Sequence, residues 1–403
     1  MPELTSLYIH IPFCRHRCSY CDFNTYAGLE GLIPKYMASL QQEVAWAGQA
    51  AGEKLPVHTI FLGGGTPSLI PAHDLALLLE TCDQYFAVQP GAEISLEANP
   101  GTVTLASLKD LRQAGFNRIS LGMQSANAID LALLERQHGT LDVIRAVEWA
   151  RQAGFSNLNL DLIYGLPAQP LERWQETLET ALALQPEHFS LYALSIEHGT
   201  PFRKWLEHGL VSAPDDDLAA DMFEWACERL EAAGYGHYEI SNWGKRADGE
   251  TLACRHNLQY WRNLPYFGLG AGAHGYVNGV RTANQRGVKA YIQSMAKNQP
   301  VGFPGGAAAE TALPVDRWTA MQEHMMVGLR LLDEGVSDAR FSQRFGVTLK
   351  QAFPKQIQQL EQTGLLEWAG DGSDVLRLSQ RGWLLGNQVF SEFVAVQEPA
   401  RLS

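Results

Sequence analysis

The first 240 residues alternate between short runs with strand character and longer stretches in which apolar residues recur at helical spacing. This alternation constrains the fold more than any other feature, because strands separated by helices pair in parallel. The predicted strands cover residues 6–11, 59–62, 93–97, 118–123, 157–163 and 189–194. The clearest predicted helices cover residues 33–49, 72–86, 105–114, 128–138 and 141–153. We therefore expect an α/β fold with a parallel sheet covered by helices.

One short pattern recurs where a predicted helix gives way to a strand. Arg-Gln-Ala-Gly-Phe occurs at residues 112–116 and 151–155, and the variant Glu-Ala-Ala-Gly-Tyr occurs at 231–235. Glycine suits the end of a helix because it adopts the left-handed conformation that closes it. Such joints occur in any α/β protein, but their repetition favours a closed or partly closed barrel over an open sheet.

The texture of the sequence changes after Tyr235. Residues 236–287 are rich in Gly, Asn and aromatics and predict loops and short strands. Further helical patterns at 317–332, 338–345 and 350–363 precede a Gly/Asp turn between two short strands, an order similar to a winged helix. We therefore predict three domains, at residues 1–235, 236–314 and 315–403.

The predicted winged-helix-like domain could serve DNA binding or protein docking. Acidic residues lie close to the few basic residues of its second and third helices. These basic residues are Arg340, Arg344, Lys350 and Lys355. The whole chain has a net charge of −13, whereas a general nucleic-acid binder needs a basic face to neutralise phosphates. We therefore expect a docking or structural role, and no nucleic-acid partner.

The sequence predicts a cytoplasmic protein. We find no run of about 18 apolar residues that would span a membrane, and no secretory signal in residues 1–10. A reducing compartment makes metal or redox chemistry a better explanation of the six cysteines than a disulfide framework.

Three of these cysteines, Cys14, Cys18 and Cys21, have the spacing CxxxCxxC. Thiolates are the usual ligands of iron–sulfur clusters, and three of them hold three irons of a cubane, which leaves the fourth iron open. A structural zinc site is the alternative, but it would need a fourth ligand from His16 or from a distant residue. The Arg-His-Arg sequence between the first two cysteines makes the loop polar, which argues against a chance group of core cysteines.

Together with Tyr8-Ile-His-Ile-Pro-Phe, the cysteine motif resembles the start of a radical S-adenosylmethionine (SAM) protein of the oxygen-independent coproporphyrinogen oxidase group. The resemblance covers nearly the whole chain. It implies a partial (β/α)6 TIM-like barrel with a C-terminal α+β, winged-helix-like domain. It also implies a [4Fe–4S] cluster on Cys14, Cys18 and Cys21, with the amino and carboxylate groups of SAM on the open iron.

The resemblance also implies which residues contact SAM. The segment Gly63-Gly-Gly-Thr-Pro67 matches the part that meets the methionine amino group, although by itself it could be an ordinary turn. Several of the other residues end predicted strands, where barrel active sites form. The implied cofactor-binding residues are Tyr8, Tyr20, Gly64, Gly65, Thr66, Glu97, Gln124, Arg136, Asp161 and Ala193.

Two features separate the chain from the oxidase branch of this family. That branch continues CxxxCxxCxC, and here the last of those positions is Phe23. The segment His256-Asn-Leu-Gln-Tyr-Trp261 resembles a signature of the heme-chaperone branch, in which the histidine is implicated in heme binding. Imidazole is a common axial ligand of heme iron, and Tyr260 and Trp261 offer flat apolar surfaces. The alternative is a hydrogen-bonded loop histidine beside core aromatics.

Two functions follow from the resemblance, and the sequence leaves open whether the protein is an enzyme. One is a heme chaperone that binds the cluster, SAM and heme and transfers heme to acceptor proteins, which include membrane-bound respiratory enzymes. The other is a radical enzyme that decarboxylates two propionates of coproporphyrinogen III. Phe23 and the His256 motif favour the chaperone. The resemblance allows a monomer or a homodimer.

Overall fold

The computed structural model describes residues 4–370, 372, 374–394 and 396–398, and the chain divides into two compact units. The first unit joins the chain up to Gly234 with Pro265–Leu313, and the second joins Tyr235–Leu264 with the chain from Pro314 onward. The predicted middle domain, 236–314, is thus shared between the units. Its first part packs with the C-terminal region, whereas its second part extends the large sheet of the first unit.

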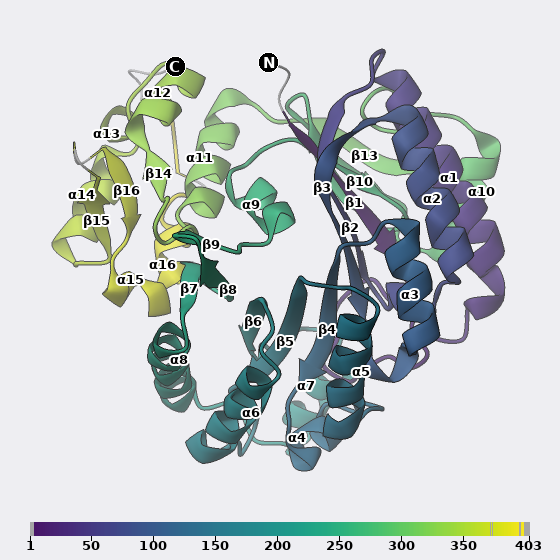
Figure 1. Cartoon of the computed structure of the whole chain (residues 1–403). Coiled ribbons are helices and arrows are strands. Elements are labelled where there is room, and N and C mark those ends of the chain that lie inside the picture. Colours follow the sequence, from purple (N-terminus) through teal and green to yellow (C-terminus); the bar gives the residue numbers. More distant parts are fainter. Residues whose placement is uncertain (1–3, 371, 373, 395, 399–403) are drawn as a thin grey trace. The chain divides into compact units, whose positions relative to one another are not determined.

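Six parallel strands form the centre of the first unit, and each pairs with the next in chain order (Figure 1). Most of their residues are buried, as expected when helices cover one face and the barrel interior the other. The parallel sheet predicted from the alternation is confirmed, and so is the partial (β/α)6 barrel that the family resemblance implied. The strands are β1 (Thr5–Ile11), β2 (Pro56–Gly64), β3 (Ala87–Ala98), β4 (Arg118–Gln124), β5 (Leu158–Tyr164) and β6 (His188–Ala193).

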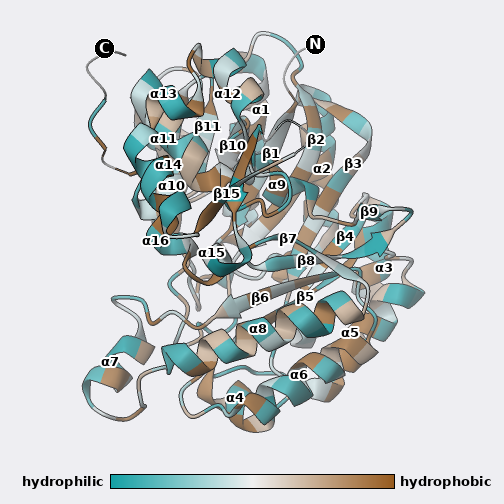
Figure 2. Cartoon of the chain, turned by 90° about the vertical axis from the view of Figure 1, so that its left-hand side faces the viewer, coloured by the Kyte–Doolittle hydropathy of each residue, from teal (hydrophilic) through white to brown (hydrophobic). Residues whose placement is uncertain are grey.

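Helices follow these strands, and Figure 1 shows α1, α2, α3 and α5 lined up along their outer side. Hydrophobic and hydrophilic residues alternate along α5, α6 and α8 in Figure 2, as expected of helices with one buried face. The α-helices are α1 (Ile33–Ala50), α2 (Ala72–Tyr85), α3 (Leu105–Ala114), α4 (Ala128–Leu133), α5 (Thr140–Gln152), α6 (Leu171–Ala183), α7 (Pro201–Glu207) and α8 (Asp216–Ala232). Short 3-10 helices cover Glu30–Leu32, Pro67–Leu69 and Pro100–Thr102.

The repeated Gly-aromatic joints form as predicted. Helices α3 and α5 end just before Gly115 and Gly154, which have φ of +112° and +92°, and the aromatic that follows each glycine is buried. The arginine of each repeat closes its own joint, because Arg112 and Arg151 donate to the carbonyl oxygens of Phe116 and Phe155 at 3.1 and 3.3 Å. The repeat thus encodes a capped helix end as well as a turn.

A second set of strands extends the sheet beyond β1. Strand β10 (Tyr266–Leu269) pairs in parallel with β1, and β11 (His274–Val277) and β12 (Val280–Asn284) continue antiparallel from it. Strand β13 (Ala309–Pro314) lies at the edge, and α10 (Val288–Lys297) packs on α1. These additions attach a glycine-rich loop, residues 270–273, to the strand that precedes the cysteines.

The second unit has its own core, centred on Phe341, Phe353 and Met325. Its helices and small antiparallel sheet follow the predicted winged-helix order. The helices are α9 (Arg255–Trp261), α11 (Arg317–Gly328), α12 (Asp338–Phe345), α13 (Leu349–Ala352), α14 (Pro354–Gln362), α15 (Gln380–Leu384) and α16 (Gly386–Ser391). The strands are β7 (Tyr235–Glu239), β8 (Asn242–Ala247), β9 (Glu250–Thr251), β14 (Val336–Ser337), β15 (Leu366–Ala369) and β16 (Val375–Leu378).

Two predicted helices of this unit differ from those observed. The helix predicted over 350–363 is split, because Pro354 disfavours helical geometry at the residue before it, and Phe353 has φ −125° and ψ 52°. The helix predicted to reach residue 332 ends at Gly328. Across the described part of the chain, none of the helices combines the length and apolarity of a bilayer span.

Candidate functional site

The three motif cysteines lie in the irregular loop that follows β1. A turn closed by the backbone N–H of Cys21 and the carbonyl of Cys18 (3.2 Å) brings the last two together. All three side chains are partly buried and line one cavity, whereas Cys82 and Cys254 are fully buried elsewhere. The loop therefore presents three thiols to a common space, as the spacing predicted.

Each of these thiols has a polar side chain within hydrogen-bonding reach. Thr66 Oγ1 lies 3.5 Å from Cys14 Sγ, and Thr25 Oγ1 lies 3.8 Å from Cys21 Sγ. Arg136 Nη1 lies 3.7 Å from Cys18 Sγ. Hydrogen bonds and positive charge stabilise a thiolate, and hydrogen bonds to sulfur tune the potential of a cluster.

The donor set fits a cluster better than a single ion. In the described part of the chain, no three His, Cys, Asp or Glu side chains converge as the ligands of one metal ion do. A cubane presents a separate iron to each thiolate, so its ligands need only face one space. The three cysteines meet that condition.

The cavity has a volume of about 410 Å³ and lies within the first unit. Its lining includes the three cysteines and nine of the ten residues implied as cofactor ligands, namely Tyr20, Gly64, Gly65, Thr66, Glu97, Gln124, Arg136, Asp161 and Ala193. These residues come from β2 to β6, from the segments that follow β2 and α4, and from the cysteine loop. Parallel strands bring them together because their carboxyl ends meet at one end of the barrel.

The tenth residue, Tyr8, does not line the cavity. Its hydroxyl lies 2.9 Å from His10 Nδ1, and His10 Nε2 lies 2.9 Å from the carbonyl oxygen of Asn24. Tyr8 and His10 therefore connect β1 to the segment just after the last motif cysteine. This placement gives Tyr8 a supporting position behind the cavity wall.

The glycines of residues 63–65 are required by packing against the protein itself. A Cβ on Gly64 would lie 2.2 Å from the His10 ring, and Gly64 has φ +107°. A Cβ on Gly65 would lie 2.7 Å from the carbonyl oxygens of Ile11 and Phe13. The segment is pressed onto β1 and the start of the cysteine loop, which is how Thr66 reaches Cys14.

Two carboxylates, Glu97 and Asp161, face the cavity from neighbouring parts of the sheet. Burial, and then the charge of Asp161, raises the pKa of Glu97 to about 7, against the opposing effect of the Gly64 N–H at 2.9 Å. Burial also raises the pKa of Asp161, although Ser120 donates to it at 2.8 Å. Asp161 lies in the middle of β5 rather than near its end as predicted. The cavity thus holds one carboxyl group that titrates near neutral pH.

Gln124 and Arg136 flank the short helix α4. Gln124 ends β4 with φ +65°, and Arg136 Nη2 donates to the carbonyl of Gly122 at 3.0 Å. The Nε of Arg136 is buried without a hydrogen-bond partner. An unsatisfied buried donor of this kind is expected where an anionic ligand binds. The predicted helix 128–138 ends at Leu133, so Arg136 lies in an irregular segment that reaches back to the cavity.

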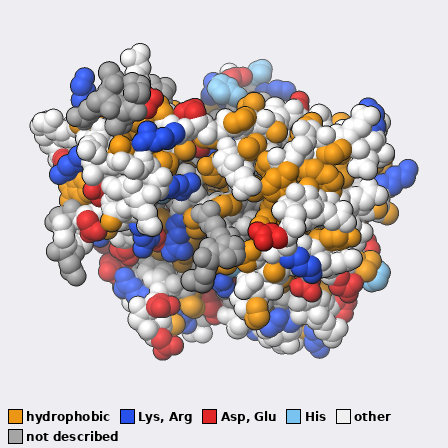
Figure 3. All heavy atoms as spheres, turned by 90° about the horizontal axis from the view of Figure 1, so that it is seen from above, with side chains coloured by type: hydrophobic (Ala, Val, Ile, Leu, Met, Phe, Trp, Pro, Cys, Tyr) orange, Lys and Arg blue, Asp and Glu red, His pale blue; other side chains and the backbone are white. Residues whose placement is uncertain are grey.

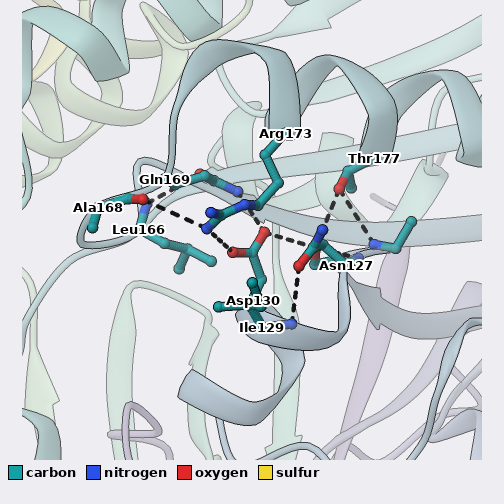
Figure 4. Close-up of polar contacts among 10 residues, drawn as sticks. Asn127, Ile129, Asp130, Leu166, Ala168, Gln169, Arg173 and Thr177 are labelled. Carbon is teal, nitrogen blue, oxygen red and sulfur yellow. Dashed lines mark hydrogen bonds and ion pairs between the residues drawn. The ribbon is translucent and has the colours of Figure 1, made fainter.

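A buried carboxylate that the sequence analysis missed holds α4 in place (Figure 4). Asp130 is 1% exposed and accepts hydrogen bonds from Ser125 (3.0 Å), Gln169 (3.0 Å) and Arg173 (3.1 Å). Figure 4 shows Gln169 and Arg173 converging on it from the segment that begins α6. Asp130 thereby anchors the chain between Gln124 and Arg136. No motif marks it, because Gln169 and Arg173 lie far away in sequence.

The loop after β10 supports the cysteine loop from the other side. Asn24 Nδ2 donates to the carbonyl oxygens of Ala271 and Arg286, both at 2.9 Å. A Cβ on Gly272 would lie 2.4 Å from Asn24, so this glycine-rich loop packs directly on the segment after Cys21. His274, the residue after this loop, begins β11 and is exposed.

His256 lies in the second unit, in the first turn of α9. It is 1% exposed, and its Nε2 lies 2.9 Å from the Tyr260 hydroxyl. Its neighbour Trp261 lies under the Arg330 guanidinium, 4.4 Å from the ring centroid. Within the second unit, His256 thus contacts Tyr260 of its own helix, and Trp261 contacts Arg330.

The basic residues of the winged-helix-like region are largely engaged by other residues of the second unit. Arg340 pairs with Glu334 at 3.2 Å, and Arg344 donates to the carbonyl of Asn263 at 3.1 Å. Lys350 lies 4.7 Å from the centroid of the Trp368 ring. On the face seen in Figure 3, basic side chains are interspersed with acidic ones. These contacts suit a structural or docking role better than phosphate binding.

Two family models match parts of the chain. That of the radical SAM superfamily matches residues 8–181, which include the cysteine loop and the strands up to β5. That of the HemN C-terminal domain matches residues 315–385 in the second unit.

Curated relatives match nearly the whole chain. A protein from Bacillus subtilis (strain 168) named heme chaperone HemW is 38% identical over 394 residues, 97% of this chain and 99% of the relative. A protein of the same name from Escherichia coli (strain K12) is 36% identical over 98% of this chain and 99% of the relative. The structure of the E. coli coproporphyrinogen III oxidase HemN superposes with a TM-score of 0.83 at 23% identity, covering 98% and 91% of the two chains. That likeness concerns the fold.

Proposed function

Because the chain belongs to the HemW family of radical SAM proteins, we propose that it is a heme chaperone, which binds heme and transfers it to acceptor hemoproteins. The observation that carries this proposal is its identity, over nearly the full length, to relatives that bear the heme chaperone name. Following the family resemblance, we expect respiratory hemoproteins among the acceptors. The cavity in the first unit would hold the cluster and SAM, and the His256 segment in the second unit would bind heme.

We propose that Cys14, Cys18 and Cys21 ligate a [4Fe–4S] cluster. The support is that all three thiols line one cavity and that each has a polar side chain within reach. SAM would bind beside them, with its carboxylate on Arg136 and its ribose hydroxyls on Glu97. The unpartnered Nε of Arg136 supports the first assignment, and the cavity-facing carboxylate of Glu97 supports the second.

When both are bound, the cluster and SAM supply one-electron chemistry, and the protein contributes binding, orientation and exclusion of water. Arg136 would hold the SAM carboxylate while also donating toward Cys18. Tyr20 and Ala193 would enclose the adenine, since both line the same cavity. Gln124, held in place by α4, offers an amide to the remaining polar groups.

We propose His256 as the heme ligand. Because its Nε2 is hydrogen-bonded to Tyr260, iron coordination through that atom requires the imidazole to exchange the hydroxyl for iron. Because the residue is buried, heme can reach it only after the side chains that cover it move. Heme loading is therefore expected to be slower than simple association with an exposed histidine.

The deciding experiment reconstitutes the cluster without oxygen and titrates heme into the wild type and His256→Ala. His324→Ala, which removes a partly buried histidine elsewhere in the second unit, is the control. We expect the Soret change to be weakened in His256→Ala alone, and heme to pass from the wild type to an apo-hemoprotein. Equal binding by all three proteins would exclude His256 as the ligand.

The same preparation tests the oxidase alternative. Turnover of coproporphyrinogen III to protoporphyrinogen IX, measured with SAM and a reductant, would overturn the chaperone proposal. In parallel, Cys18→Ser should abolish the iron–sulfur absorbance, whereas Cys82→Ser, a change at a buried cysteine outside the motif, should keep it. A cluster that survives in Cys18→Ser would contradict the ligand assignment.

A further inference from the structure

Two exposed aromatic rings stand at the opening of the cavity. Phe23 is 65% exposed and Tyr192 is 43% exposed, yet both line the cavity that holds the three cysteines. Among the residues that the structure describes, no other Phe, Tyr or Trp is this exposed. Aromatic side chains are normally buried, so two such rings around one opening indicate a ligand surface.

The two rings come from the two ends of the series of six parallel strands. Phe23 belongs to the loop that follows β1, and Tyr192 is the last residue but one of β6. A ligand that contacts both rings must therefore span the opening between the loop after β1 and the end of β6. Flat, extended and largely apolar molecules fit this requirement, because offset stacking on aromatic rings favours planar partners.

The charges around the opening indicate which polar group the ligand carries. Arg17 is exposed, lines the same cavity and donates to the carbonyl of Cys21 at 3.3 Å, which leaves other N–H groups of its guanidinium available. A guanidinium of this kind recognises a carboxylate. Asp22 and Glu197 also line the opening, so an anionic group is expected on the Arg17 side.

We propose that Phe23, Tyr192 and Arg17 form a docking surface for the tetrapyrrole ring of heme, with a propionate on Arg17. The identity of the ligand rests on the proposed function, and the surface itself rests on the first unit alone. The contact is made to the macrocycle rather than to iron, so it does not depend on ligation by His256. Phe23, which stands where the oxidase branch has a cysteine, thus supplies one of the two aromatic rings of this docking surface.

The test uses the full chain with its cluster reconstituted and two probes, heme and metal-free protoporphyrin IX. The variants are Phe23→Ala with Tyr192→Ala, the conservative pair Phe23→Tyr with Tyr192→Phe, and Arg17→Gln. Leu141→Ala, which truncates a 68% exposed side chain on α5, is the control. We expect the double alanine variant to weaken both probes by about tenfold or more and Arg17→Gln by about threefold. The conservative double variant, Phe23→Tyr with Tyr192→Phe, and the control Leu141→Ala should bind both probes as the wild type does.

Four outcomes would overturn the docking surface. Unchanged porphyrin affinity in the double alanine variant, in a preparation whose wild type binds and transfers heme, would remove the surface and leave the chaperone function intact. An equal loss of SAM affinity would assign the rings to the SAM site. An equal loss in Leu141→Ala would indicate nonspecific adhesion. If the wild type bound neither probe, the proposed function and the docking surface would fail together.

Discussion

The Glu97 carboxylate accepts a hydrogen bond of 2.9 Å from the backbone N–H of Gly64, which joins the ends of β3 and β2 inside the cavity. Burial and the nearby charge of Asp161 raise the pKa of Glu97 to about 7, which places its ionisation near neutral pH. As the proposed partner of the SAM ribose, the ionised carboxylate accepts stronger hydrogen bonds than the acid does.

SAM affinity is therefore expected to rise as the pH increases through about 7, by roughly tenfold in total. Glu97→Gln keeps an oxygen for the Gly64 N–H but cannot ionise, so its affinity should be low and independent of pH. Equilibrium dialysis of SAM with the reconstituted protein at a series of pH values measures this. A wild-type affinity that stays flat across this range would contradict the assignment of Glu97.

The raised pKa of Glu97 also predicts how the stability of the fold depends on pH. Because the pKa of Glu97 is raised from 4.5 to about 7 in the folded state, folding favours its protonated form. The resulting stabilisation is fully present below pH 4.5 and is lost as the pH rises through 7. Glu97→Gln should therefore gain on the order of 3 kcal/mol relative to the wild type at alkaline pH. Urea denaturation of the two proteins at acid and alkaline pH measures the difference, and Glu30→Gln, at an exposed site, should show none.

Arg136→Lys is expected to weaken SAM binding by roughly tenfold to a hundredfold, because lysine cannot reproduce a planar, multidentate guanidinium. The variant also removes the donor that faces Cys18, so the reduction potential of the cluster should change. Arg151→Lys is a matched control, since Arg151 pairs with Glu187 at 2.8 Å and does not line the cavity. Calorimetric SAM titration and electrochemistry of the cluster give the two readouts, and equal effects of both changes on SAM binding would argue against a specific role.

Asp130→Asn should destabilise the first unit by about 3 kcal/mol, because it leaves the Arg173 guanidinium beside a neutral group. We also expect SAM affinity to fall severalfold, since Asp130 anchors the helix between Gln124 and Arg136. Glu187→Gln breaks a comparable ion pair outside the cavity and should cost stability without affecting SAM. Unchanged SAM affinity in a folded Asp130→Asn protein would limit Asp130 to a structural role.

Tyr260→Phe is expected to increase heme affinity by about threefold to tenfold, because it removes the hydroxyl that competes with iron for His256 Nε2. Heme titration followed by the Soret band measures this, and adding His256→Ala should cancel the gain. A Tyr260→Phe variant that binds heme more weakly than the wild type would indicate that the tyrosine itself contributes to the site.

Much of the fold could be predicted from local sequence. Parallel strands buried on both faces need nearly continuous apolar runs, and helices between them need helical periodicity, so the alternation predicts a parallel sheet covered by helices. The Gly-aromatic joints are equally local, since a helix end, its glycine and its capping arginine lie within five residues, as at 112–116. The cysteine loop belongs to this class too, because its three candidate ligands lie within one turn-rich segment.

Only the tertiary structure decided which distant side chains meet. Asp130 and Arg173 lie 43 residues apart, and nothing in either segment indicates that they form an ion pair. Phe23 and Tyr192 line one cavity although they belong to the first and the last of the six strand regions, and their exposure depends on what else packs there. The burial of His256 against Tyr260 likewise depends on the packing of α9. Local spacing determines which way a chain segment folds, whereas burial, pKa and access arise from surroundings that several segments build together.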